Sequence, residues 1–317
     1  EKNGEIYNAR RRVKWPGEAA VVVSTVHVSK GPATGVSVLL DSRPVSRISA
    51  FVREGDFDDT PQVLKENESK SFVGSYILGM GFTFDDENAA KGKATSLAEM
   101  ERLIQNDPRN ADRIKPYLGG SEINTDPDHK HHRFVIDFED FPLRRDASLK
   151  SWLDASDSEK RDMLRQGIVP ESYPDPVAED WPDLLEIVER LVKPERDKIK
   201  DEIGKRVWWR FLRAREELQD AKAHKATVYA LCRVSSNLGV AKVRSDVIFA
   251  DSCVVFTEAD VVSIISSVHE IWARLLSSSM KDDLRYSPSD CFQNFPTTEY
   301  KAQNNYLSSV VANYLEV

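Results

Sequence analysis

The sequence contains only three cysteines in 317 residues, Cys232, Cys253 and Cys291. Three scattered cysteines are too few for a disulfide framework or a four-cysteine zinc site, which favours a reducing compartment. No run of about 18 apolar residues is present, and no apolar segment follows the charged start EKNGEIYNARRR, so neither a membrane span nor a signal peptide is expected. The expected location is the cytoplasm.

Positive charge is also scarce, because 44 Lys and Arg face 52 Asp and Glu, for a net charge of −8. This balance argues against a generic nucleic-acid binder, which needs a local excess of Lys and Arg. The charges are unevenly distributed, however. Acidic residues concentrate at 54–59, 85–87 and 154–183, whereas Lys and Arg outnumber acids at 193–215. A basic face on an acidic protein suits specific more than promiscuous DNA binding.

The length allows one large or two ordinary domains. No initiator methionine is present, so we expect a piece of a longer protein. The strand and helix candidates along the chain predict an α+β fold with mixed sheet and helices. We expect a strand at 19–29 paired with 36–41, a Gly-interrupted strand at 72–84, a helix from the capping box at Ser96, and a meander of strands at 227–234, 238–243 and 247–256.

The segment 261–276 predicts one amphipathic helix. Its apolar residues recur at steps of three and four, as expected for a helix that packs on a core through one stripe: Val261, Ile264, Ile265, Val268, Trp272, Leu275 and Leu276. The opposite face would carry His269, Glu270 and Arg274. A charged turn follows at 281–286, and the residues from Thr297 to the end of the sequence predict a short helix with polar flanks.

Four blocks occur in an order that resembles a known family: PYLGGSEIN at 116–124, RFVIDF at 133–138, WPDLLEIVERLVKPERD at 181–197 and SSVHEIWARLLSSSMKDDLRYSPSDCFQNFP at 266–296. They resemble the C-terminal part of MmeI-like (type IIG/IIL) restriction-modification enzymes and of related phage-defence adenine-N6 DNA methyltransferases. The resemblance runs from about Arg10 to Pro296. A stretch at 146–180 interrupts the family pattern and is interpreted as an insertion.

The resemblance implies a domain order. Residues 1–50 would be the tail of a methyltransferase fold, 51–260 a target-recognition domain, and 261–317 a C-terminal helical packing segment. The implied partners are double-stranded DNA and a methyltransferase domain upstream in the same polypeptide. S-adenosylmethionine would be the cofactor of that parent enzyme, with no cofactor on this chain.

Such a methyltransferase needs a Gly-rich loop for S-adenosylmethionine and an Asn/Asp-Pro-Pro-aromatic turn for the flipped adenine. Gly79 and Gly81 follow a strand pattern, but TFDDEN follows them where a helix should open, so backbone bending is the favoured role. The Asp-Pro pairs at 107, 126 and 175 lack the second proline and predict turns. No catalytic residue is therefore assigned to this chain.

Metal-dependent chemistry receives little support. His129, His131 and His132 lie near two aspartates, but adjacent residues 131 and 132 point to opposite sides of an extended segment, which favours a solvated loop. Asp137, Glu139 and Asp140 lack the lysine that a nuclease strand of the PD-(D/E)xK type requires. We assign no metal ligands.

The candidate DNA-backbone residues combine arginine with aromatic side chains, which suits phosphate pairing and base stacking. They are Lys205, Arg206, Trp209, Arg210, Arg213 and Arg215. An amphipathic helix with Trp208, Phe211 and Leu212 in the core and the arginines in solvent is the alternative, and both interpretations are compatible.

The candidate base-reading residues lie on a predicted strand, turn and strand: Arg233, Ser235, Asn237, Lys242 and Arg244. Arg can grip guanine through two hydrogen bonds, Asn can grip adenine, and Ser suits either base. An ordinary turn would show the same residues. The main alternative function is a protein-interaction scaffold in a defence complex, for which the acidic segment at 146–180 is suited. A metal-dependent nuclease is a third possible function.

Overall fold

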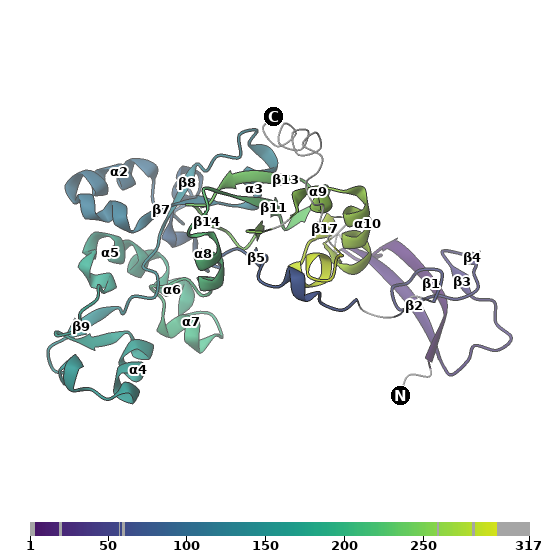
Figure 1. Cartoon of the computed structure of the whole chain (residues 1–317), viewed down its shortest axis with the longest axis horizontal. Helices are drawn as coiled ribbons and strands as arrows, with labels where there is room; N and C mark the ends of the chain where they lie inside the picture. Colours follow the sequence, from purple (N-terminus) through teal and green to yellow (C-terminus); the bar gives the residue numbers. More distant parts are fainter. Residues whose placement is uncertain are drawn as a thin grey trace. The chain divides into compact units, whose positions relative to one another are not determined.

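The structure, a computed structural model, describes residues 4–18, 21–56, 58, 61–258, 260–280 and 283–296, with backbone only at 279 and 280. Mixed sheets and short helices confirm the α+β class (Figure 1). The chain forms two compact units. Unit 1 comprises residues 1–71, 232–240 and 258–317, and unit 2 comprises 72–231 and 241–257. The assignment of 1–50 to a methyltransferase fold stays a prediction, as do the other two domain assignments.

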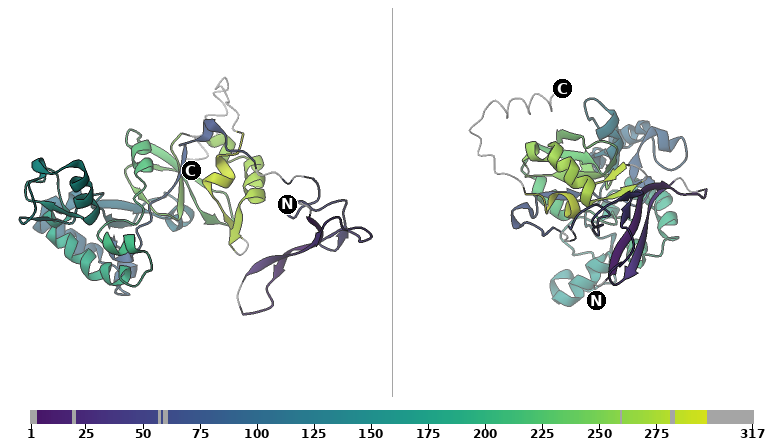
Figure 2. Two further views of the ribbon diagram at one scale, coloured as in Figure 1. Left: turned by 90° about the horizontal axis from the view of Figure 1, so that it is seen from below. Right: turned by 90° about the vertical axis from the view of Figure 1, so that its right-hand side faces the viewer.

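Unit 1 begins with a four-stranded sheet of order β2-β1-β3-β4. Its strands are β1 (Gly4–Lys14), β2 (Val22–Lys30), β3 (Leu39–Leu40) and β4 (Arg43–Pro44). The two long strands are antiparallel, with Gly4 opposite Lys30 (Figure 2). The predicted pairing of 19–29 with 36–41 is wrong, because β2 pairs with β1 and β3 lies parallel on the other side of β1. The polar sequence of β1 concealed this strand. Ala9, Leu40 and Ile48 form the small core of this sheet.

The remainder of unit 1 contains a three-stranded sheet, β12-β17-β16, with helices next to it in the sequence. The elements are η1 (Lys65–Asn67), β12 (Val234–Ser235), α9 (Val261–Ile264), α10 (Ser267–Leu276), β16 (Ser278–Met280), β17 (Asp283–Arg285) and the π-helical turn η6 (Pro288–Phe292). Asn67 joins this part from a distant point of the chain, since its Nδ2 donates to the carbonyl oxygens of Phe292 and Phe295 at 3.0 and 2.8 Å. The helix expected after Thr297 lies outside the described residues.

The predicted apolar stripe of 261–276 is wrong in two respects. The segment is two helices, because Ser266 caps a new helix by accepting a hydrogen bond from the backbone N–H of His269. The buried face of α10 carries His269 and Ala273, both 0% exposed, whereas Val268 is 65% exposed. The restart at Ser266 rotates the second helix out of register with the first, so a pattern read across both helices misassigns the buried face.

The first sheet of unit 2 has the order β14-β7-β8-β6. It contains β6 (Thr83–Phe84), β7 (Ile114–Leu118), β8 (Arg133–Ile136) and β14 (Ile248–Phe249). β8 matches the predicted RFVIDF strand, and β14 joins β7 in parallel from far along the sequence. Next to this sheet in sequence lie η2 (Met80–Phe82), α1 (Asp86–Ala89), α2 (Leu97–Asn106), η3 (Pro108–Asp112) and α3 (Gly120–Thr125). The Ser96 capping of α2 is confirmed, as Ser96 Oγ accepts from Glu99 N–H.

The second sheet of unit 2 has the order β13-β11-β15-β5. Its strands are β5 (Ser71–Val73), β11 (Thr227–Cys232), β13 (Val240–Arg244) and β15 (Cys253–Phe256). β11 lies between β13 and β15, so the expected simple meander is wrong. The expected strand at 72–84 is also wrong: its two ends, β5 and β6, belong to different sheets. Cys253 and Val255 are buried in a shared core with Val228 and Phe249.

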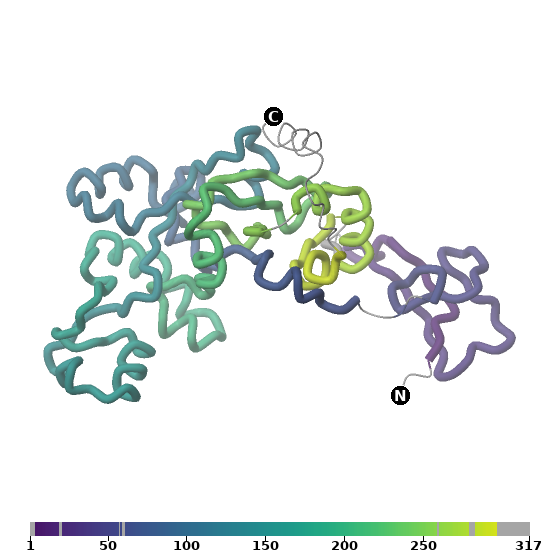
Figure 3. The backbone as a smooth tube through the Cα atoms, in the orientation of Figure 1, coloured from purple at the N-terminus to yellow at the C-terminus, as the bar shows by residue number. Residues whose placement is uncertain are grey.

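Residues 144–180 fold into a small β-α-β unit within unit 2. β9 (Arg144–Asp146) pairs in parallel with β10 (Ile168–Pro170), and α4 (Asp157–Gln166) connects them, with η4 (Trp152–Asp154) and η5 (Ala178–Asp180) on either side. Figure 3 shows the chain running out through α4 and back. Helices α5 (Pro182–Leu191), α6 (Lys193–Arg196), α7 (Glu202–Arg206) and α8 (Glu216–Lys222) follow. Among the described residues no helix is long and apolar enough to cross a membrane.

Candidate nucleic-acid interface

The arginine and tryptophan segment at 205–215 is held in place by a buried arginine. α7 ends at Arg206, and the chain continues without regular helix to α8, so the predicted amphipathic helix does not form there. Arg196 is 0% exposed and donates to the carbonyl oxygens of Gly204 at 3.1 Å and Arg210 at 3.0 Å. Its Nε and Nη2 also donate to the carbonyls of Leu78 and Ile77. This guanidinium therefore fixes the path of the segment.

Trp209 and Arg210 are held by contacts inside unit 2. This corrects the prediction that they contact the DNA backbone. Trp209 is 1% exposed, and its Nε1 donates to the carbonyl oxygen of Phe141 at 2.9 Å. Arg210 Nε donates to the same oxygen at 2.7 Å, and its guanidinium lies 5.2 Å from the Trp209 ring centre. Burial lowers the pKa of Arg210. A buried indole cannot stack on a base, and a guanidinium bound to main chain is poorly placed to reach phosphate.

The other four candidates in this segment differ from one another in exposure. Arg206 and Arg213 are exposed, and Lys205 is half-buried in an ion pair with Glu202 at 2.7 Å. Arg215 is half-buried and has a left-handed backbone, with φ of 62°, at the start of α8. Arg206 and Arg213 are thus the members of the predicted set that remain suited to phosphate contact.

The predicted base-reading residues fall on two structural units. Arg233, Ser235 and Asn237 belong to unit 1, whereas Lys242 and Arg244 belong to unit 2. In unit 1, Ser235 Oγ accepts from the backbone N–H of Asn237 at 3.3 Å, and the Asn237 side chain is exposed. This is the geometry of a serine-stabilised turn.

β13 presents its two basic residues on one face. Ala241 and Val243 are buried, while Lys242 and Arg244 alternate with them and are exposed. Arg244 forms an ion pair with Asp246 two residues on. An exposed ion pair of this kind has little net stabilising effect, so the guanidinium can exchange its partner for another acceptor.

The end of helix α5 packs against the Gly79-x-Gly81 loop. This loop forms the turn η2, and a Cβ placed on Gly81 would lie 2.4 Å from Cβ of Leu191. Gly79 has φ of 138°, a conformation that L side chains rarely adopt. Both glycines therefore allow close packing of this turn against residues 191 and 192, and not the bending of a continuous strand that the sequence predicted.

The histidine loop has its own local contacts. His131 packs edge-on against Phe134 with ring centres 5.2 Å apart, and Glu122, buried nearby, binds Arg133 with Nε to Oε1 at 2.6 Å. Within the described ranges, no group of three His, Cys, Asp or Glu side chains is placed to hold a metal ion. Burial raises the pKa of Asp137, whose Oδ1 accepts from the backbone N–H of Glu139.

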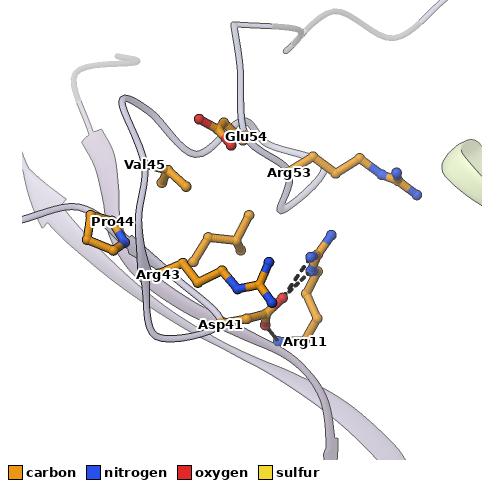
Figure 4. Close-up of a pocket in the computed structure, with 8 residues that line it drawn as sticks. Arg11, Asp41, Arg43, Pro44, Val45, Arg53 and Glu54 are labelled. Carbon is orange, nitrogen blue, oxygen red and sulfur yellow. Dashed lines mark hydrogen bonds and ion pairs between the residues drawn. The ribbon is translucent and has the colours of Figure 1, made fainter.

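A cavity that the sequence did not predict lies in unit 1, on the N-terminal sheet. It has a volume of about 560 Å³ and is lined by Arg11, Leu40, Asp41, Arg43, Pro44, Val45, Arg53 and Glu54 (Figure 4). Arg11 lies on β1, Arg43 on β4, and Arg53 in the following loop. A second cavity in the same unit shares Arg11, Asp41 and Arg53 and adds Arg12 and Arg274.

The paired arginine of this cavity is Arg11. Its Nε and Nη2 donate to Asp41 Oδ2 at 2.8 and 2.7 Å, and its backbone N–H donates to Oδ1 at 2.7 Å. These hydrogen bonds lower the pKa of Asp41. Arg43 and Arg53 are exposed and form no hydrogen bond or ion pair through their side chains with the described residues.

Sequence spacing concealed this cavity, because its arginines are separated by 32 and 10 residues along the chain. One signal was present. Residues 4–56 hold eight Lys and Arg and five Asp and Glu, a local positive excess in a protein of net charge −8. Such a local excess identifies a segment for anion binding even when the whole chain is acidic.

The comparisons with known proteins find a likeness among solved structures. No family model and no curated protein matches the chain. Among solved structures, the chain is similar to the type IIL restriction-modification enzyme MmeI in complex with DNA, with a TM-score of 0.60 and 17% sequence identity. The similarity covers 99% of this chain and 37% of that enzyme, so the chain spans little more than a third of its length. At this level of identity the likeness shows a shared fold.

Proposed function

We propose that this chain recognises a DNA target sequence for an adenine-N6 DNA methyltransferase of a restriction-modification or phage-defence system. The observation that carries the proposal is the fold shared over 99% of the chain with MmeI, an enzyme whose structure was solved with DNA. The four sequence blocks resemble the C-terminal part of the same family.

The chemistry of the reaction would belong to a methyltransferase domain of the same polypeptide, acting in the cytoplasm with S-adenosylmethionine as methyl donor. This chain would hold duplex DNA so that the catalytic domain can extrude and methylate the adenine. The Gly79-x-Gly81 turn supports this division of labour, because Leu191 and Val192 occupy the space next to its glycines.

Selection from a random duplex library tests this proposal. The 317-residue chain should enrich a defined sequence motif, and its binding should weaken steeply with salt. Salt-sensitive binding without a motif would reduce the role to non-specific DNA contact. An absence of DNA binding would contradict the proposal and favour the alternative of a protein-interaction scaffold.

Calorimetric titration with S-adenosylmethionine is a second test. The chain should show no binding at micromolar cofactor concentration. A micromolar Kd would contradict the division of labour proposed here and would place a methyl-donor site on this chain.

A further inference from the structure

The cavity of Figure 4 is lined by more positive than negative side chains. Three guanidinium groups line it, from Arg11, Arg43 and Arg53, with two carboxylates, from Asp41 and Glu54. Asp41 is bound to Arg11 by two side-chain hydrogen bonds. Arg43 also acts on Asp41 electrostatically, and Glu54 lies on the same cavity, so three guanidinium groups and two carboxylates leave an excess of one positive charge. An anion bound in this cavity would be attracted by that excess.

A tight turn places Arg43 in this cavity. Leu39 pairs with Pro44 and Leu40 with Arg43, so Asp41 and Ser42 are the two central residues of a hairpin connection. Their φ angles are 50° and 66°, as a type I′ turn requires, although the usual Asn-Gly or Asp-Gly sequence is absent. The hydrogen bonds from Arg11 to Asp41 stabilise this turn, whose sequence is uncommon for its type. The turn places Arg43 next to Arg11.

A second uncommon conformation precedes Arg53. Val52 has φ of 55°, which is an outlier for a β-branched residue, and its backbone N–H donates to the carbonyl oxygen of Ser49 at 2.9 Å. The carbonyl oxygen of Arg53 accepts from Ser49 N–H at 2.8 Å. Residues in such conformations concentrate where the chain positions functional groups. Here they precede two arginines, Arg43 and Arg53, that line one cavity from separate segments of the chain.

From this arrangement we propose that the cavity lined by Arg11, Arg43 and Arg53 binds a phosphate group of a nucleic-acid backbone. Guanidinium groups are the side chains best matched to phosphate oxygens, because their N–H donors lie in a planar fork. The Arg11–Asp41 pair positions the site, and Arg43 and Arg53 supply the phosphate contacts. This site rests on the proposed function, since the phosphate would belong to the DNA that the chain recognises. It lies outside both segments that the sequence indicated.

The test compares two double variants of equal charge change. Arg43→Ala with Arg53→Ala removes the proposed contacts without breaking an ion pair among the described residues. Arg161→Ala with Arg165→Ala is the control, because both arginines are exposed on α4 and neither forms an ion pair with a described residue. Binding to one duplex is measured by fluorescence anisotropy at several salt concentrations, and circular dichroism verifies folding of each variant.

For the cavity variant, the slope of log K against log salt should fall in magnitude by about 1.8, or about 0.9 for each phosphate contact, with affinity roughly tenfold or more weaker at 0.1 M salt. The control should keep the wild-type slope. An unchanged slope in the cavity variant would overturn the phosphate site while leaving the proposed function intact. An equal fall in both variants would overturn it as well, because overall charge would then explain the effect.

A second measurement separates the site from the proposed function. Thermal unfolding of the wild type should shift upward when chloride is replaced by inorganic phosphate at equal ionic strength, and the shift should vanish in Arg43→Ala with Arg53→Ala. If duplex DNA does not bind the wild type, both the proposed function and the proposal of a nucleic-acid ligand for this site are wrong. A thermal shift with phosphate that depends on Arg43 and Arg53 would then indicate that the cavity binds a different phosphate compound. Equal shifts in both proteins would show that phosphate does not bind there.

Discussion

His269 on α10 forms a hydrogen-bonding contact with Tyr286, its Nε2 lying 2.8 Å from the phenol oxygen. Both side chains are buried, at 0% and 1% exposure, and Phe295 packs edge-on against the imidazole with ring centres 4.5 Å apart. Burial lowers the pKa of His269 to about 4 and raises that of Tyr286 well above its usual value. A polar pair therefore connects α10 to the end of β17 inside unit 1.

The first prediction concerns the pH dependence of this pair. His269 binds a proton in the unfolded chain at a pKa near 6.5 and in the folded chain only at about 4. The unfolded state thus holds more protons between these values, and the free energy of unfolding should fall as pH is lowered from 6.5 to 4, by roughly 3 kcal/mol. Urea unfolding of the wild type and of His269→Gln at pH 7.5 and 5 covers the upper part of this window, where the expected loss is roughly 2 kcal/mol. Equal pH dependence in both proteins would contradict the assignment to His269.

The second prediction concerns Arg196, whose guanidinium donates to four backbone carbonyls. Arg196→Met should lower the free energy of unfolding by at least about 3 kcal/mol, because buried acceptors are then left without donors. Arg206→Met is the matched control, since Arg206 is exposed ten residues away, and it should change stability by less than about 0.5 kcal/mol. Chemical denaturation gives both values. Similar effects for the two variants would show that the carbonyls find other donors.

The third prediction uses two glycines with the same backbone conformation and different surroundings. Gly167 has φ of 76°, and a Cβ there would lie 2.3 Å from Cη2 of Trp209, whereas Gly92 has φ of 70° and open space around it. Gly92→Ala should cost only the conformational penalty, about 1–2 kcal/mol. Gly167→Ala should cost more and should shift tryptophan fluorescence, because Trp209 must move. Equal decreases in stability without a spectral change would contradict the close approach of Trp209 to Gly167.

Several local elements could be predicted from sequence because their signals lie within a few residues. The capping serine of α2, the strand β8 and the proline-started helix α5 are of this kind. The pairing of β2 with β1 could not be predicted, since β1 is rich in polar residues and only Ala9 in it is buried. Trp209 and Arg210 were misassigned because their partner, the Phe141 carbonyl, is 68 residues distant from Trp209 and backbone carbonyls leave no sequence signal. The arginine cavity likewise depends on contacts between separate loops.

The fourth prediction revises which arginines of 205–215 contact DNA. Arg206→Ala with Arg213→Ala should weaken binding to all duplexes alike and reduce the salt slope by about 0.9 for each arginine that binds a phosphate. Both side chains are exposed, so folding should be retained. Anisotropy titrations across salt concentrations measure the slope, with Arg161→Ala and Arg165→Ala as the control of equal charge. A wild-type slope in the Arg206 and Arg213 variant would remove this segment from the interface.

The fifth prediction concerns base reading by the exposed face of β13. Lys242 and Arg244 point to the same side of the strand, so both can reach one groove of a duplex if this face contacts DNA. Arg244→Ala should relax preference at one base position, since a contact to a base edge contributes roughly 1–3 kcal/mol of discrimination while a phosphate contact contributes almost none. Selection from a random library by Lys242→Ala, Arg244→Ala and Asn237→Ala, each tested alone, locates the reader. Arg144→Ala, an exposed arginine on β9, should leave the motif unchanged. If all three variants retain the full motif with lower affinity, these side chains contact the backbone, and base reading must come from another surface.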